Sequence, residues 1–286
     1  MSWKYFKQAI NVGCYSLGGF SLYYLISNEN NKKFVQNSWI SDLKPPSTKW
    51  DKNWDHRDPS ALLKSSLPEN PTPDQQNKHN EELEKVTAKA VRHIILIRHG
   101  QYNTHALTDK GRILTELGRE QAKMSGLRLN ELKIPITNFV MSTMTRAQET
   151  GNIILNQLDN KKFIIENCSL IEEGAPIPPE PKVGHWKPQN WQFFVDGSRI
   201  EAGFRKHFHR AAPDQKEDSY TVLVCHANVI RYYVCRALQV PPEAWLRMSL
   251  HHASITWLSI YPENGRVILK LFGDCGHIPK KSLSTA

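Results

Sequence analysis

The chain has 286 residues, of which 40% are hydrophobic and 23% are charged, and it contains eight tryptophans. This composition excludes a wholly disordered or collagen-like chain, because it supplies enough apolar side chain for a buried core. The net charge of +9 favours anionic partners. We expect no nucleic-acid partner, because the basic residues are interspersed with acidic ones and no aromatic-basic RNA-binding signature accompanies them.

The amino-terminal residues 1–33 are predicted to be a membrane anchor or a targeting segment. Residues 8–27 carry no charged side chain, and twenty helical residues reach about 30 Å, the thickness of a bilayer core. Lys4 and Lys7 precede this stretch, and Lys32 and Lys33 follow it. A cleaved signal peptide and a buried helix are the alternatives to a membrane anchor.

Residues 34–90 are predicted to be a polar tether. Six prolines interrupt this region and disfavour helix or central strand, namely Pro45, Pro46, Pro59, Pro68, Pro71 and Pro73. The alternation of Glu and Lys around Leu83 and Val86 predicts a short helix over Glu81–Ala90, which leads into the folded domain.

A tryptophan-aspartate motif lies inside this tether, at residues 50–57. It contains Trp50, Asp51, Trp54 and Asp55. An exposed indole is costly unless it has a binding partner. The first interpretation is an assembly motif whose tryptophans anchor in another subunit or partner, as interface hot spots do. The second is that the segment packs back on its own domain.

Residues 91–286 are predicted to form one α/β domain. The strands are expected at Arg92–Ile97, Phe139–Met141, Phe163–Ile165, Tyr220–Cys225, Ser254–Tyr261 and Arg266–Phe272, and the helices at Thr115–Leu132, Thr145–Leu158 and Asn228–Leu238. Alternating strands and helices predict a mainly parallel central sheet with helices on both faces. Ligands of such sheets bind beyond the carboxyl ends of the strands.

Charged and imidazole side chains follow four of these predicted strands. They are Arg98 and His99, then Arg146, then Glu172 and Glu173, and finally His226. Imidazole is a competent nucleophile toward phosphorus, and guanidinium groups match phosphate oxygens bidentately. A second histidine stabilises the transferring group, and a protonated Glu supplies a proton to the leaving oxygen. These residue types therefore predict phosphoryl transfer through a phosphohistidine.

The same residues resemble those of the histidine phosphatase superfamily, in its phosphoglycerate mutase branch. The resemblance covers roughly residues 91–275 and rests on Arg98-His99-Gly100, Ser-x-Met-x-Arg146-Ala, Glu173-Gly-Ala-Pro and His226. It implies that His99 is the nucleophile and that Glu173, rather than Glu172, is the acid. It also implies that Arg98, Arg146 and His226 bind the phosphate, that His226 takes part in catalysis, and that neither a cofactor nor a metal is needed.

Two departures from the sugar mutases bear on the substrate. Gln-Tyr-Asn-Thr follows Gly100, and only about fifty residues separate Glu173 from His226, which shortens the lid over the pocket.

The motif at 50–57, the stretch His185-Trp-Lys-Pro188 and residues 225–232 further resemble a membrane-anchored mitochondrial group of serine/threonine protein phosphatases. This implies phosphoserine and phosphothreonine proteins as substrates, self-association through residues 50–57, and a mitochondrial membrane location through residues 8–27.

Other interpretations of the same residues remain open at this point. Cys225 and Arg231 have the spacing of cysteine-dependent phosphatases, but the intervening residues lack the glycine of a phosphate loop. The pairs His207 with His209 and His251 with His252 lack Cys or carboxylate ligands at metal-site spacing. A membrane scaffold that only binds phosphoproteins, and a phosphomonoesterase or mutase of small molecules, are the alternative functions.

Overall fold

The computed structural model of the chain describes residues 49–63, 67–184 and 186–285. The predicted membrane segment 8–27 lies outside these residues. Within them, every helix is too short or too polar to cross a membrane. Residues 51–286 form one compact unit, which holds every element described below.

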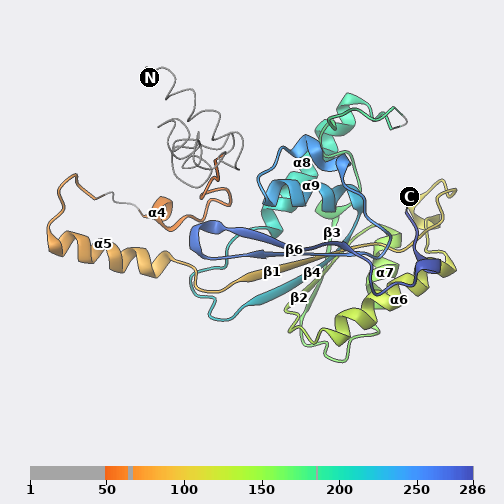
Figure 1. Cartoon of the computed structure of the whole chain (residues 1–286), viewed down its shortest axis with the longest axis horizontal. Helices are drawn as coiled ribbons and strands as arrows, with labels where there is room; N and C mark the ends of the chain where they lie inside the picture. Colours follow the sequence, from red (N-terminus) through yellow and green to blue (C-terminus); the bar gives the residue numbers. More distant parts are fainter. Residues whose placement is uncertain (1–48, 64–66, 185, 286) are drawn as a thin grey trace, which may run out of the picture. The chain divides into compact units, whose positions relative to one another are not determined.

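A six-stranded sheet forms the centre of the unit (Figure 1). Its strands follow the order β3-β2-β4-β1-β5-β6, and β5 is the strand that runs antiparallel to its neighbours. They are β1 (Arg92–Arg98), β2 (Asn138–Ser142), β3 (Ile164–Cys168), β4 (Ser219–Cys225), β5 (Ile255–Ile260) and β6 (Val267–Asp274). The predicted α/β sheet, mainly parallel, is confirmed.

Helices cover both faces of this sheet (Figure 1). Helices α6 (Glu116–Glu131) and α7 (Thr145–Leu155) lie on one face, and α8 (Asn190–His207) and α9 (Ala227–Ala237) on the other. Three of the four were predicted to within a few residues, but α8 was missed. Its apolar residues are spread around the helix, with Trp191 and Phe194 exposed and Phe204 buried, and this arrangement hides the helical period.

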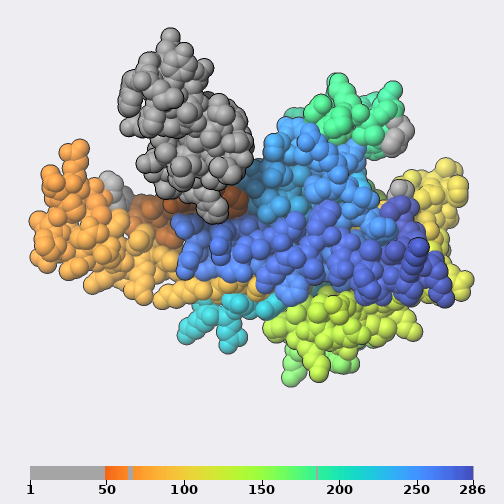
Figure 2. Space-filling view, in the orientation of Figure 1, coloured from red at the N-terminus to blue at the C-terminus, as the bar shows by residue number. Residues whose placement is uncertain are grey.

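The last two strands, β5 and β6, form an antiparallel hairpin, which closes the sheet on one side. The turn between them includes Asn264 and Gly265, both with positive φ angles, 56° and 59°. Such angles suit Asn and Gly in a tight turn. After β6, the carboxyl-terminal residues, dark blue in Figure 2, lie beside the yellow loop that follows β1.

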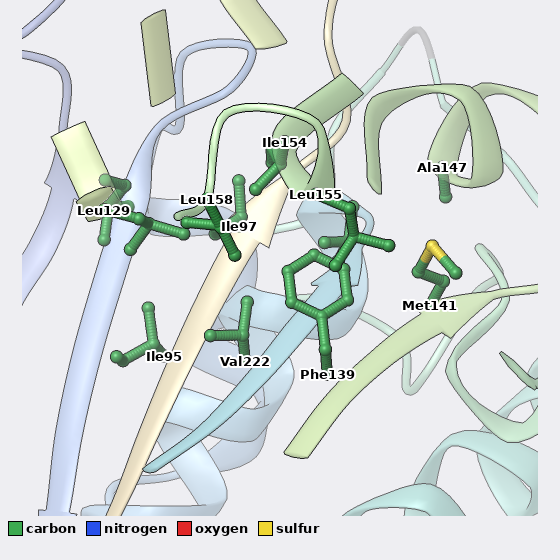
Figure 3. Packing of buried hydrophobic residues seen from close by; sticks show 12 residues of the cluster. Ile95, Ile97, Leu129, Phe139, Met141, Ala147, Ile154, Leu155, Leu158 and Val222 are labelled. Atoms are coloured by element: carbon green, nitrogen blue, oxygen red, sulfur yellow. The ribbon is translucent and has the colours of Figure 1, made fainter. Parts of the chain in front are cut away.

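The hydrophobic core lies between the sheet and helices α6 and α7 (Figure 3). Ile95 and Ile97 of β1 meet Phe139 and Met141 of β2 there, together with Val222 of β4. Six of the seven residues of β1 are buried, because helices cover the sheet on both sides. The continuous apolar run in the sequence reflects this burial.

The predicted tether contains more helix than expected. Helix α5 spans Pro73–Val86, and a short helix α4 spans Pro59–Leu62. The expectation of a proline-disrupted tether was wrong here, because a proline at the first helical position fits helix geometry and lacks only an N–H that would be unpaired anyway. Thr72 and Gln75 form a capping box at the start of α5, so this helix begins earlier than the predicted residue 81.

The tryptophan-aspartate segment, residues 51–57, packs on its own domain. The indole of Trp54 is 7% exposed and donates to the carbonyl oxygen of Gly265 at 2.8 Å. Asp55 is buried against Arg210. At Trp54 the structure therefore agrees with the second interpretation, in which the segment packs back on its own domain. Self-association through residues 50–57 stays a prediction.

Candidate active site

The structure brings the predicted catalytic side chains together at the carboxyl ends of β1, β2 and β4. Arg98 ends β1 and His99 follows it, Arg146 lies in the first turn of α7 after β2, and His226 caps α9 after β4. The rings of His99 and His226 are 5.1 Å apart. Arg146 Nε donates to His99 Nε2 at 3.2 Å. Four strand-end residues that are distant in sequence therefore form one pocket.

His99 has a defined tautomer and orientation. Its Nδ1 lies 2.8 Å from the carbonyl oxygen of Gly100, and a carbonyl only accepts, so Nδ1 carries the proton. The lone pair therefore lies on Nε2. The amide of Gly100 donates to Thr150 Oγ1 at 3.0 Å, and a side chain at residue 100 would collide with the backbone of Gly118. The glycine is thus required for the close approach of this loop to α6.

Both imidazoles of the pocket are held neutral. His99 is 2% exposed and His226 is fully buried. Burial lowers the pKa of His99 well below its ordinary value, and the neighbouring His226 and the positive charges of Arg146 and Arg98 lower it further. Burial, followed by Arg146, Arg199 and Arg98, does the same to the pKa of His226. A neutral His99 retains the lone pair that a nucleophile needs.

Hydrogen-bond donors without a partner surround His99. In the described part of the chain, Arg98 Nε, Arg146 Nη1 and His226 Nδ1 are buried and make no hydrogen bond. Ser142 Oγ accepts from the amide of Met144 and lies 2.8 Å from His226 Nε2; donation by this hydroxyl to Nε2 leaves the proton on Nδ1. Buried donors normally find partners, so this arrangement suits a bound anion with several oxygens.

Glu173 has the properties of an acid at the edge of this pocket. It is half-buried, and burial raises its pKa, opposed by Arg146, the amide of Gly174 and Arg98. Its backbone carbonyl accepts from Arg199 Nη2 at 3.1 Å. Glu172 instead accepts a short hydrogen bond from Thr143. The geometry favours Glu173 over Glu172 as the proton donor, although both roles stay predictions.

Three further residues contact the predicted set, and none of them was predicted to belong to the phosphate pocket. The ring of Tyr102 packs edge-on against His99 and lies 4.7 Å from the Arg146 guanidinium. His252 Nε2 is 3.1 Å from Arg98 Nη2. Asp109 accepts from the amide of Thr145 and lies 3.6 Å from Arg146. The sequence analysis noted Tyr102 only as part of the departure from the mutase pattern after Gly100, and His252 only as part of a histidine pair considered for a metal ion.

The alternative nucleophile does not face this pocket as a reactive group. Cys225 is fully buried at the end of β4, and burial raises the pKa of its thiol, so it stays protonated. Arg231 interacts instead with the charge of Glu173. Among the described residues, no group of three or more His, Cys, Asp or Glu side chains is arranged to hold a metal ion.

Comparisons with known proteins agree with this geometry. The model of the histidine phosphatase superfamily, branch 1, matches residues 94–174 and 184–272. The mitochondrial serine/threonine-protein phosphatase Pgam5 of Drosophila pseudoobscura pseudoobscura is 55% identical over 273 residues, which cover 95% of this chain and 93% of that protein. Its namesake from Drosophila melanogaster is 52% identical with the same coverage.

A solved structure extends the comparison to the fold. Bacillus stearothermophilus YhfR is 20% identical, and the match covers 66% of this chain and 100% of that one with a TM-score of 0.50. This likeness concerns the fold alone. The family model and the identity over nearly the whole chain show that the protein belongs to branch 1 of the histidine phosphatase superfamily, among its Pgam5-type members.

Proposed function

We propose that the protein is a serine/threonine protein phosphatase that acts through a phosphohistidine on His99 and needs no metal ion for this step. The observation that carries the proposal is the neutral His99, which lies beside buried N–H groups of Arg146 and His226 that make no hydrogen bond. The names of the Pgam5 relatives support the substrate class. Phosphoserine and phosphothreonine proteins are therefore the proposed substrates.

The first chemical step transfers the phosphoryl group to His99. Nε2 attacks phosphorus while the ester P–O bond breaks, and Glu173 gives its proton to the departing serine or threonine oxygen. The phosphoryl oxygens take the N–H groups of Arg98, Arg146 and His226. Arg146 Nε, which donates to Nε2 at 3.2 Å, exchanges this contact for a phosphoryl oxygen when the substrate enters.

The second step returns the enzyme to its starting state. Water attacks the phosphorus of the phosphohistidine, the P–N bond breaks, and the Glu173 carboxylate accepts the proton of the water. Inorganic phosphate then leaves, and His99 Nε2 regains its lone pair. The short connection between Glu173 and His226 and the half-buried position of Glu173 support access of water and of a protein-borne phosphate to the pocket.

Cellular placement follows from the relatives and from the sequence. The Pgam5 relatives are named as mitochondrial, which supports a mitochondrial location for this chain. We further propose attachment to a mitochondrial membrane through residues 8–27 and assembly into homo-oligomers through residues 50–57. Neither proposal depends on the chemistry of the pocket.

The test is hydrolysis of a phosphothreonine peptide by the full chain in the presence of EDTA. His99→Ala is expected to lose at least about 1,000-fold in kcat/KM, because it removes the nucleophile. The matched control is His105→Ala, which changes an exposed histidine six residues further on and should keep the wild-type rate. Equal loss in Cys225→Ser but not in His99→Ala would assign the nucleophile to the cysteine.

Two other outcomes would favour the alternative functions. A wild-type chain that hydrolyses small phosphate esters but no phosphopeptide would be a small-molecule phosphomonoesterase. A wild-type chain that binds phosphopeptides and hydrolyses neither substrate would be a phosphoprotein-binding scaffold. Either result contradicts the proposed protein phosphatase.

A further inference from the structure

A carboxyl-terminal segment, Ser282–Ser284, is hydrogen-bonded to residues that contact the phosphate pocket. In Figure 1 this end of the chain lies near α6, which carries Gln121. Gln121 Nε2 donates to the carbonyl oxygen of Ser282 at 2.7 Å and to Ser284 Oγ at 2.8 Å. Ser284 Oγ also lies 2.9 Å from His252 Nδ1, and the backbone carbonyl oxygen of Ser284 accepts from the His252 amide at 3.0 Å.

These contacts fix the tautomer of His252. Its Nε2 lies 3.1 Å from Arg98 Nη2, and a guanidinium only donates, so Nε2 must be the unprotonated acceptor. The proton of the neutral ring is then on Nδ1, where it is donated to Ser284 Oγ. Ser284 therefore provides the acceptor that keeps His252 in the one tautomer able to accept from Arg98.

A second set of contacts joins the same serine to the loop that carries the nucleophile. Gln121 is fully buried, and its Oε1 accepts from the amide of Gln101 at 2.9 Å. Its amide nitrogen is thereby directed to Ser282 and Ser284. The Ser284 hydroxyl thus accepts hydrogen bonds from Gln121 and from His252. His252 in turn accepts from Arg98, and Gln121 accepts from the backbone amide of Gln101, two residues after His99.

We propose that Ser284 is a positioning residue for the phosphate pocket, which orients the Arg98 guanidinium by fixing the Nδ1–H tautomer of His252. Without the acceptor at residue 284, the Nδ1–H of His252 is left unpaired in a buried site. Moving the proton to Nε2 relieves this but turns an N–H toward the donors of Arg98, so the guanidinium must shift. The inference rests on the proposed phosphate chemistry only for its effect on activity.

The charges around His252 agree with this assignment. Its ring is 3% exposed, and burial lowers its pKa to about 3, aided by Arg98, His251 and Arg146 and opposed by its bond with Ser284. The ring is therefore neutral at physiological pH. Only a neutral imidazole has distinct tautomers for Ser284 to select.

The first measurement is the tautomer of His252, read from two-bond ¹H–¹⁵N spectra of the histidine-labelled full chain, with the resonance assigned through His252→Gln. Wild type and Ser284→Thr are expected to show the Nδ1–H form. Ser284→Val and Ser284→Ala should lose the Nδ1–H form. Valine matches the shape of threonine but lacks the hydroxyl, so it tests the hydroxyl alone. The matched control Thr285→Ala changes the exposed neighbouring residue and should match wild type.

The second measurement is the affinity for orthovanadate, a phosphate analogue, on the same variants. We expect Kd to rise about tenfold in Ser284→Val and Ser284→Ala, because a misdirected guanidinium loses much of a charge-assisted hydrogen bond. Ser284→Thr and Thr285→Ala should stay within about twofold. An unchanged tautomer or an unchanged affinity in both hydroxyl-free variants would overturn the proposal. The tautomer needs no catalysis, so it remains informative even if the protein hydrolyses no phosphopeptide.

Discussion

Two regions of the molecule bury charged side chains, and they differ in whether a carboxylate of the chain binds the buried arginine. In the segment of residues 51–57, Asp55 accepts four hydrogen bonds, three from Arg210 and one from the amide of Arg57. In the pocket, Arg98 and Arg146 each keep a buried nitrogen that makes no hydrogen bond within the described residues. The Asp55 carboxylate holds Arg210 by direct hydrogen bonds, although Arg210 Nη1 is also buried without one. Within the described residues, neither pocket arginine makes a hydrogen bond to a carboxylate.

This difference distinguishes a segment that is attached to the fold from a pocket that can bind a ligand. A buried carboxylate whose acceptors are filled stabilises the fold and has little left to offer a ligand. Buried donors with free N–H groups cost folding free energy unless a ligand takes them up, and such costs are typical of active sites. Mutations in the segment should therefore lower the free energy of unfolding, whereas mutations of the pocket arginines should lower activity with little effect on stability.

The largest effect is expected from Asp55→Ala. The change leaves the Arg210 guanidinium, which is 1% exposed, buried without its counter-ion, and breaking a buried pair in this way costs about 3–5 kcal/mol. The free energy of unfolding, measured by urea denaturation of the full chain, should fall by this amount.

The double variant Asp55→Leu with Arg210→Met serves as the control for this prediction. Replacing both partners by apolar side chains removes the uncompensated charge, so most of the lost free energy should return. A loss below about 1 kcal/mol in Asp55→Ala would mean that the segment is not anchored as the structure describes.

The next effect concerns Arg146→Lys, which keeps the charge. Lysine cannot reproduce the Nε donation to His99 or the planar contact with Tyr102. We expect kcat/KM on a phosphothreonine peptide to fall about 100-fold, as for other donors to a transferring group. The free energy of unfolding should change by less than about 1 kcal/mol, because Arg146 keeps a buried nitrogen that makes no hydrogen bond within the described residues.

A comparison variant for this prediction is Arg128→Lys, at an exposed arginine of α6. It should leave both quantities unchanged. Equal activity in Arg146→Lys and wild type would show that a point charge suffices at residue 146, and that the unpartnered guanidinium nitrogens do not bind phosphate.

The same contrast explains what the sequence could predict. The pocket was predictable, because parallel strands bring their carboxyl ends to one edge of the sheet, so residues that follow strands meet there. The burial of Trp54 was not, because its hydrogen-bond partners Gly265 and Arg205 lie more than 150 residues away and no local pattern marks them. The contacts of His252 with Arg98 and with Ser284 were missed for the same reason, because they join residues that are distant in sequence.

The smallest of the expected effects is the contribution of a single buried histidine to acid sensitivity. His207, 5% exposed on α8, has its pKa lowered by burial to about 4. An unfolded histidine binds its proton near pH 6.5, so between about pH 6.5 and 4 the unfolded state holds more protons than the folded state. The free energy of unfolding must then fall as the pH falls through this window. For one such group the loss by pH 5 is on the order of 2 kcal/mol.

Urea unfolding at pH 7 and pH 5 measures this effect. His99, His226 and His252 also have lowered pKa values and add to the fall in stability, whereas the raised pKa of Glu173 acts in the opposite direction. His207→Gln removes one titrating group and keeps a neutral polar side chain. Its stability should therefore depend less steeply on pH than that of wild type, by about 2 kcal/mol across the interval. Identical pH dependence in the two proteins would mean that His207 is protonated in the folded state, and that burial does not keep this histidine neutral.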